Sequence, residues 1–232
     1  MEHQILNLFP LSIYKSKLGL TDEYKKELIS EIVTMTENSS QLDYKTNNDA
    51  WTGDTQGYDK LYENKKFDFF FSQISKHLKN YIEYFEIDTS TIDCYFQRSW
   101  ATLSNSQENI KHHRHVQSHL SFAYYLKKSK QDSNIQFVNM DHPSEFIPSL
   151  FHSRTVKLSK VFKNRNIKNS SVIDLNCLED EIVIFPSKTR HGTQPFVKND
   201  NRVSISADIL IVAKDSKNME HMMPPLNQWK KF

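Results

Sequence analysis

Hydrophobic residues recur at helical spacing in the first part of the chain. Between positions 67 and 85 the apolar side chains fall three or four residues apart and form one wide face, made of Phe67, Phe70, Phe71, Ile74, Leu78, Tyr81, Ile82 and Phe85. A second helix is predicted over residues 22–35, with Thr21 as its N-cap. An apolar face of this width has to cover another apolar surface, most simply a sheet.

The pattern changes at residue 92, where short β-rich runs replace the helical spacing. Polar loops separate these runs, which span residues 92–103, 118–127, 134–139, 154–160, 181–186 and 202–212. Upstream, residues 6–18 contain Pro10 and are expected to form an edge strand or an arm, and residues 38–60 a polar loop. Helices first and strands afterwards indicate an α+β fold, an antiparallel β-sandwich or barrel flanked by N-terminal helices.

The length of the chain fits one domain with one sizeable core. Over its 232 residues we expect a single domain, with a helical support region at 1–90, a β core at 91–215 and a C-terminal arm at 216–232. The sequence leaves the oligomeric state open, a homodimer included.

Composition narrows the function classes. Hydrophobic residues make up 38% and charged residues 25%, as in soluble globular proteins. With only four glycines a Rossmann or P-loop enzyme is disfavoured, and a net charge of +2 does not suggest a nucleic-acid partner. No apolar run approaches a membrane span. Two cysteines, Cys94 and Cys177, fit no metal or redox spacing, and with no apolar N-terminal run they predict a cytoplasmic protein.

Histidines cluster immediately before one predicted strand. Four of the ten lie between positions 112 and 119. Side chains two positions apart in an extended chain point the same way, so His113 and His115 are able to meet at one point. Neutral imidazole is a good ligand for Fe, Zn, Cu and Ni. A run of solvated surface histidines would look the same, so the cluster by itself leaves both interpretations open.

A further histidine, His191, follows the apolar run 181–186, and Gly192 beside it permits an unusual backbone. Eleven residues later begins a strand whose polar face consists of Arg202, Ser204, Ser206 and Asp208. A half-exposed strand would show the same alternation. An arginine and a serine two residues apart nevertheless match a carboxylate ligand, and their position after a candidate metal ligand strengthens that interpretation.

With these motifs the chain resembles the 2-oxoglutarate/Fe(II)-dependent oxygenases of the double-stranded β-helix (jelly-roll, cupin-like) fold. It is most similar to a small family of such oxygenases from marine bacteria and their phages. The resemblance runs nearly end to end and is carried by residues 8–14, 99–100, 113–115 with 120–126, 184–187, 191 and 202–206.

The resemblance implies that His113 and His191 are iron ligands, with His115 at the position where the wider superfamily has Asp or Glu. It implies that Arg202 binds the distal carboxylate of 2-oxoglutarate and that Ser204 assists. Tyr124 or Tyr125 would add a hydrogen bond, and alternation allows only one of them to face inward. The implied activity is hydroxylation of a C–H bond in an amino acid, a peptidyl residue or a small metabolite, using Fe(II), 2-oxoglutarate and O₂ and releasing succinate and CO₂.

Three residues depart from the pattern of the family. Val116 replaces proline, Phe122 replaces glycine and adds bulk near the expected pocket, and Asp208 replaces asparagine. The third iron ligand is also unusual, because enzymes of this type generally use two histidines and one carboxylate. We favour His115 as that ligand over a carboxylate such as Asp141 or Asp208. Halogenation is disfavoured, because halogenating relatives have a small residue at the His115 position.

Two other classes of protein fit parts of the sequence. A cupin-like metalloenzyme with three histidines would not use 2-oxoglutarate and would not need Arg202. A non-catalytic β-sandwich binding module could use Trp51, Trp100 and the many tyrosines as stacking platforms.

Overall fold

The computed structural model describes residues 2–39, 48–152, 154, 160–196 and 201–232. A six-stranded antiparallel sheet forms its centre, in the order β1-β7-β4-β9-β3-β2. The strands are β1 (Tyr14–Lys17), β2 (Trp51–Thr52), β3 (Ile92–Ser104), β4 (Leu120–Lys127), β7 (Glu181–Pro186) and β9 (Arg202–Ala213). A second sheet, in the order β6-β5-β8, contains β5 (Ile135–Val138), β6 (Val172–Leu175) and β8 (Arg190–Thr193).

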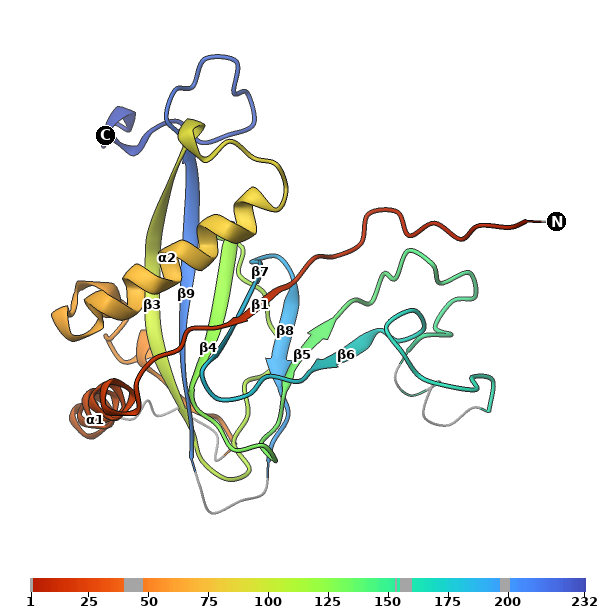
Figure 1. The fold of residues 1–232 in the computed structure, drawn as a ribbon, viewed down its shortest axis with the longest axis horizontal. Coiled ribbons are helices and arrows are strands. Elements are labelled where there is room, and N and C mark those ends of the chain that lie inside the picture. The colour runs from red at the N-terminus through yellow and green to blue at the C-terminus, as the bar shows by residue number, and fades with distance from the viewer. Residues whose placement is uncertain (1, 40–47, 153, 155–159, 197–200) are drawn as a thin grey trace.

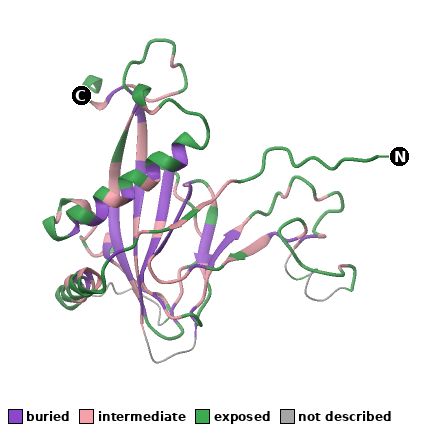
Figure 2. Cartoon of the chain, viewed as in Figure 1, coloured by how far each residue is buried: buried purple, intermediate pink, exposed green. Residues whose placement is uncertain are grey.

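Two helices cover one face of the large sheet (Figure 1). The first, α1 (Asp22–Asn38), starts at Thr21 as predicted, because the Thr21 side chain accepts a hydrogen bond from the backbone of Tyr24, and it ends three residues later than expected. The second, α2 (Asp68–Glu83), buries most of the apolar face predicted from its spacing, but Phe85 lies beyond the end of the helix and is exposed. Its side chains share one core with the apolar positions of β4, β7 and β9. Figure 2 shows that burial is concentrated in this sheet and on the side of α2 that faces it.

Alternation in the central strands separates two cores. On the helix side lie Phe122, Tyr124, Ile205 and other residues of the larger cluster. On the opposite side, Tyr125 packs in a smaller cluster with Ile135, Phe137, Cys177, Val183 and Phe185. Because Phe122 belongs to the helix side, its bulk packs against Phe70 of α2, with ring centroids 6.3 Å apart. Phe122 also borders the cavity, so its expected effect on the shape of the pocket stays a prediction.

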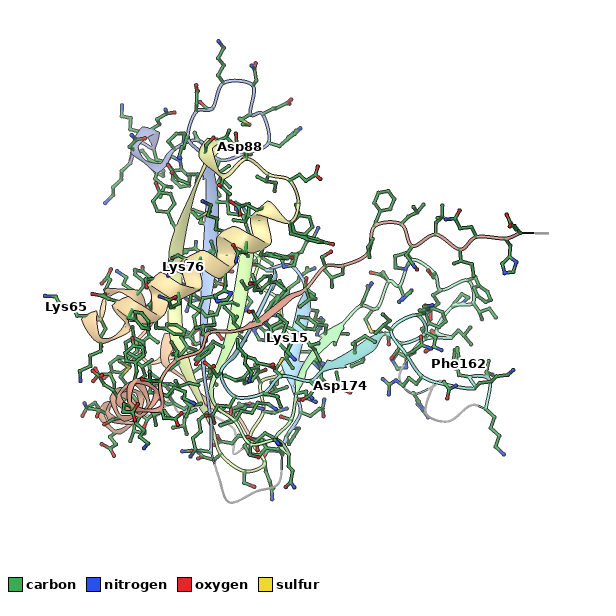
Figure 3. All side chains as sticks on the ribbon, in the orientation of Figure 1. Lys15, Lys65, Lys76, Asp88, Phe162 and Asp174 are labelled. Atoms are coloured by element: carbon green, nitrogen blue, oxygen red, sulfur yellow. The ribbon has the colours of Figure 1, made fainter. Side chains whose placement is uncertain are left out.

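The N-terminal segment ends in the edge strand that the sequence predicts. Strand β1 pairs with β7, and Lys15 (labelled in Figure 3) makes an ion pair of 2.9 Å with Glu181. Residues 2–13 before this strand extend away from the body of the molecule and are largely exposed (Figures 1 and 2). A charged side chain on a short edge strand is a common protection against further strand pairing.

Three short strands were not predicted from the sequence. They are β2, inside the expected polar loop, and β6 and β8, whose few residues show no clear alternation. His191 lies on one of these unpredicted strands, β8. The strand predicted over 154–160 lies almost entirely outside the described residues. None of the helices in the described part of the chain combines the length and apolar character needed to cross a bilayer.

Candidate metal centre and cosubstrate pocket

Three histidines from two distant segments converge beside the large sheet. His113 forms an isolated antiparallel bridge with His191, in which each backbone N–H donates to the other carbonyl over 2.9 Å. The backbone N–H of His115 donates to the carbonyl of Ser187 over 3.0 Å. These bonds attach the 113–115 segment to β8 and to the end of β7. As a result, one potential ligand atom from each histidine lies within 4.8 Å of the others.

The second nitrogen of each ring is engaged, which fixes the direction of the ligand atom. Nδ1 of His113 lies 2.8 Å from the carbonyl of Lys111, and Nδ1 of His191 lies 2.8 Å from that of Thr189. Nδ1 of His115 lies 2.7 Å from a carboxylate oxygen of Asp208. An acceptor at Nδ1 assigns the proton to that nitrogen and leaves Nε2 as the ligand atom. The Nε2 atoms of His113 and His115 are only 3.1 Å apart.

Burial keeps two of the rings in the form that binds metals. It lowers the pKa of His113, and it lowers the pKa of His191 to about 3, with the neighbouring His113 adding to the effect. Because a metal binds the neutral imidazole, this environment prepares the cluster for a cation and removes competition from protons near neutral pH.

Asp208 supports the cluster from the buried face of β9. Its side chain is fully buried, and it accepts hydrogen bonds from the hydroxyls of Ser118 and Ser121 over 3.1 and 2.9 Å. Burial alone would raise its pKa, but the hydrogen bonds from His115 and the serines hold that pKa below its usual value. Asp208 thus binds His115 and is outside the histidine cluster. The other carboxylate considered, Asp141, is exposed and does not line the cavity.

A cavity of about 360 Å³ connects the histidines to Arg202. Arg202 is 2% exposed, and its partners among the described residues are neutral oxygens. They include the hydroxyls of Ser133 at 2.7 Å, Thr193 at 3.1 Å and Ser104 at 3.3 Å. In the described part of the chain no carboxylate forms an ion pair with it. A buried cation without a paired anion is costly, so this arginine is suited to a carboxylate ligand.

The remaining predicted cosubstrate residues separate into two groups. Ser204 and Tyr125 line the same cavity as Arg202. Tyr124 points to the other face of β4, where its hydroxyl donates to Asp180 over 2.9 Å, so its assignment to the cosubstrate was wrong. Thr193 was missed, although its position two residues after His191 on one strand would have placed it on the same side.

Gly192 is required for a reason other than the one expected. Its φ is not in the left-handed region. Instead, a Cβ at this position would lie 2.7 Å from the carbonyl oxygen of Ile110 and 2.7 Å from the ring of His112. The absence of a side chain lets the 110–113 segment approach β8 closely enough for His113 and His191 to pair.

Comparisons with known proteins agree with this arrangement. Residues 98–208, which contain all three histidines, match the family described as "Putative 2OG-Fe(II) oxygenase". No curated protein sequence matches the chain significantly.

Solved structures with the same fold include HygX from Streptomyces hygroscopicus with nickel and 2-oxoglutarate bound (10% identity, TM-score 0.53, 86% of this chain and 82% of that chain). A prolyl-4-hydroxylase from Pseudomonas putida is also similar (10% identity, TM-score 0.52, 86% of this chain and 92% of that chain). The α-ketoglutarate-dependent epimerase SnoN from nogalamycin biosynthesis is similar as well (9% identity, TM-score 0.56, 95% of this chain and 87% of that chain). At these identities the structures show the fold, a double-stranded β-helix with flanking helices. In residues 98–208 the chain is therefore similar to the 2-oxoglutarate/Fe(II) oxygenases, a family of enzymes that use Fe(II), 2-oxoglutarate and O₂.

Proposed function

We propose that His113, His115 and His191 hold Fe(II), that Arg202 binds the distal carboxylate of 2-oxoglutarate with help from Ser204 and Tyr125, and that the enzyme hydroxylates a C–H bond of a small-molecule or peptidyl substrate. The observation that carries this proposal is the shared cavity, which brings three converging imidazoles and a buried arginine together. In the reaction, substrate C–H, 2-oxoglutarate and O₂ give substrate C–OH, succinate and CO₂.

The histidines fit an iron ion. Metal–nitrogen bonds are about 2.1 Å long, so two neighbouring ligand nitrogens around one ion are about 3 Å apart. The 3.1 Å separation between Nε2 of His113 and Nε2 of His115 meets this requirement. An imidazole set also suits iron by its donor chemistry.

The part of the cavity beside Arg202 fits a dicarboxylate. Arg202 offers a planar fork of N–H donors, and the hydroxyls of Thr193 and Ser204 border the same space. The neutral partners that Arg202 has in this structure leave its charge available to an anion. When bound, Fe(II) and 2-oxoglutarate together supply the oxidising chemistry, while the protein supplies position and shelter.

Neighbouring side chains orient and enclose the centre. The ring of Trp100 stacks on His115, with centroids 5.7 Å apart and an interplanar angle of 16°. Phe185 contacts His191 edge-on, with centroids 4.6 Å apart. These aromatic rings cover two sides of the cluster, and Asp208 holds the ring of His115 in place through its Nδ1 atom. His191 is on strand β8, and the segment that carries His113 and His115 is attached to it by backbone hydrogen bonds, so the site is preorganised.

The test is His191→Ala, with His221→Ala as its control, because the His221 side chain is 91% exposed and outside the cavity. We expect His191→Ala to lose Fe(II) binding and succinate formation, whereas His221→Ala keeps both. The proposal also predicts a weak visible charge-transfer band when 2-oxoglutarate is added anaerobically to the Fe(II) protein. Undiminished succinate production by purified His191→Ala would overturn the assignment.

Two wider features of the enzyme also belong to this proposal. We propose that residues 1–232 act as a single domain, because residues of α1, α2 and the large sheet share one core. We further propose the cytoplasm as its compartment, because Cys94 and Cys177 are both free thiols, which fits a reducing environment.

A further inference from the structure

The cavity contains a second pair of charged side chains that the cosubstrate does not explain. Asp54, in the short 3₁₀ turn Gly53–Thr55, and Arg98, on β3, both line it. Arg98 pairs in register with Asp208, whereas Arg202 pairs with Ser104 at the far end of β3. At about 3.3 Å per residue the two arginines are separated by about 20 Å of strand. The two arginines thus lie at opposite ends of this part of the sheet, and a diacid bound to Arg202 leaves Arg98 without a role in the proposed cosubstrate site.

Both charged groups lie close to the histidines. The guanidinium of Arg98 lies over the ring of Trp100, 5.5 Å from its centroid, and Trp100 in turn stacks on His115. The carboxylate of Asp54 and the ring of His113 line the same cavity. A molecule held by Asp54 and Arg98 would therefore have its remaining atoms next to the metal centre.

The two side chains are bonded to each other, but weakly enough to be exchanged. Nη2 of Arg98 donates to Oδ2 of Asp54 over 2.9 Å, and the side chains are 33% and 17% exposed. Ion pairs with this much solvent contact contribute little net stability. A ligand that offers a carboxylate to the arginine and an ammonium to the aspartate replaces both bonds and leaves neither charge unpaired. A ligand with only one charge leaves one partner without its ion pair.

We propose that the substrate is a small zwitterion, a free α-amino acid, whose carboxylate binds Arg98 and whose ammonium binds Asp54. The inference rests on the proposed function, because it places the amino-acid side chain at the histidine cluster. The cavity of about 360 Å³ is consistent with it, since this volume is near the lower end for ligand pockets, about 300 to 1,000 Å³, and must also hold the cosubstrate. An internal peptide residue does not carry both charges.

The test begins with the wild-type enzyme loaded with Fe(II) and 2-oxoglutarate. Formation of the anaerobic charge-transfer band is recorded first. Succinate formation is then measured with each of the twenty amino acids and with three analogues of every active one, namely the deaminated acid, the decarboxylated amine and the N-acetyl amide. We expect at least one amino acid to stimulate turnover, and each analogue to lose about 10- to 100-fold in kcat/KM, the effect of removing one charged hydrogen-bond partner.

Two variants separate a ligand role from a structural one. Asp54→Asn should raise the KM for the active amino acid about 10- to 100-fold, whereas the KM for 2-oxoglutarate should stay the same. Asp59→Asn is the matched control, because Asp59 lies 3.9 Å from the same arginine but does not line the cavity. It should leave the KM for the amino acid unchanged.

Three results would overturn the inference. One is a charge-transfer band with no stimulation by any amino acid, which leaves the proposed function standing. Another is equal stimulation by a singly charged or capped analogue. The third is an Asp54→Asn variant that raises both KM values alike. Absence of the band itself would overturn the proposed function, and this inference with it.

Discussion

Substitution of Asp208 by asparagine tests the proposal that a third histidine, His115, binds the metal in place of the usual carboxylate. Asp208 keeps a negative charge beside the cluster, 2.7 Å from Nδ1 of His115. In the proposed site a carboxylate is thus still present, one imidazole ring further from the metal position. Asparagine has almost the same shape and removes the charge, so the change isolates the electrostatic contribution.

The magnitude follows from the distance. Adding the imidazole ring and a metal–nitrogen bond of about 2.1 Å puts the carboxylate about 7 Å from a bound ion. The attraction between a divalent cation and one negative charge over that distance is about 1 kcal/mol with the dielectric constant of water and about 5 kcal/mol at an effective value of about 20. Partners of metal-bound histidines typically contribute 10- to 100-fold in affinity, about 1.4 to 2.8 kcal/mol, which lies within this range. We therefore expect Asp208→Asn to weaken Fe(II) binding by about 10- to 100-fold.

The assay is anaerobic titration of the apoprotein with Fe(II), and with Co(II) for its visible absorption spectrum. The free energy of unfolding is measured in parallel on the apoprotein, so that a loss of folded protein is not mistaken for a loss of affinity. Asp180→Asn is the control, because Asp180 also accepts hydrogen bonds, from Tyr124 and from the backbone of Gly19 and Leu20, but on the helix side of the sheet. Metal affinity within twofold of wild type for Asp208→Asn, or an equal loss for Asp180→Asn, would refute the reasoning.

Three further changes test other parts of the structure. Gly192→Ala should displace the 110–113 segment, because the new Cβ would lie 2.7 Å from the carbonyl oxygen of Ile110; metal titration should show weaker binding, and unchanged affinity would contradict the close-approach argument. Arg202→Ala should weaken 2-oxoglutarate binding by at least about 10-fold and spare Fe(II), as measured by titration of the charge-transfer band; an unchanged cosubstrate affinity would place the carboxylate site elsewhere. The hydrogen bond from Lys66 lowers the pKa of Glu31 in the folded state. The ion pair therefore stabilises the fold fully at pH values above the pKa of Glu31 in the unfolded chain, about 4.3. The stabilisation is lost as the pH falls through the lower pKa that Glu31 has in the folded state. In urea unfolding at pH 7, Glu31→Gln should have a free energy of unfolding lower than that of the wild type, by less than about 1 kcal/mol. At pH 3 the two proteins should be equally stable, and an equal difference at both pH values would count against the ion pair.

Much of the secondary structure could be predicted because periodicity is a local property. The apolar face of α2 and the alternation of β9 are visible in the sequence, and both elements form with nearly the predicted bounds. The short strands β6 and β8 are different. Each has only four residues, too few to show a period, and each forms because β5 lies between them and pairs with both.

The sequence by itself determined the chemical inventory of the site: His113 and His115 two residues apart in an extended segment, His191 before a polar-faced strand, and Arg202 at the start of that strand. It also determined that only one of Tyr124 and Tyr125 faces inward. Tertiary structure decided which tyrosine that is, why Gly192 has to lack a side chain, and that Asp208 binds His115. The physical reason is that local periodicity reports which side of an element a residue occupies. What lies on that side depends on strand register and on close approach between segments far apart in the chain.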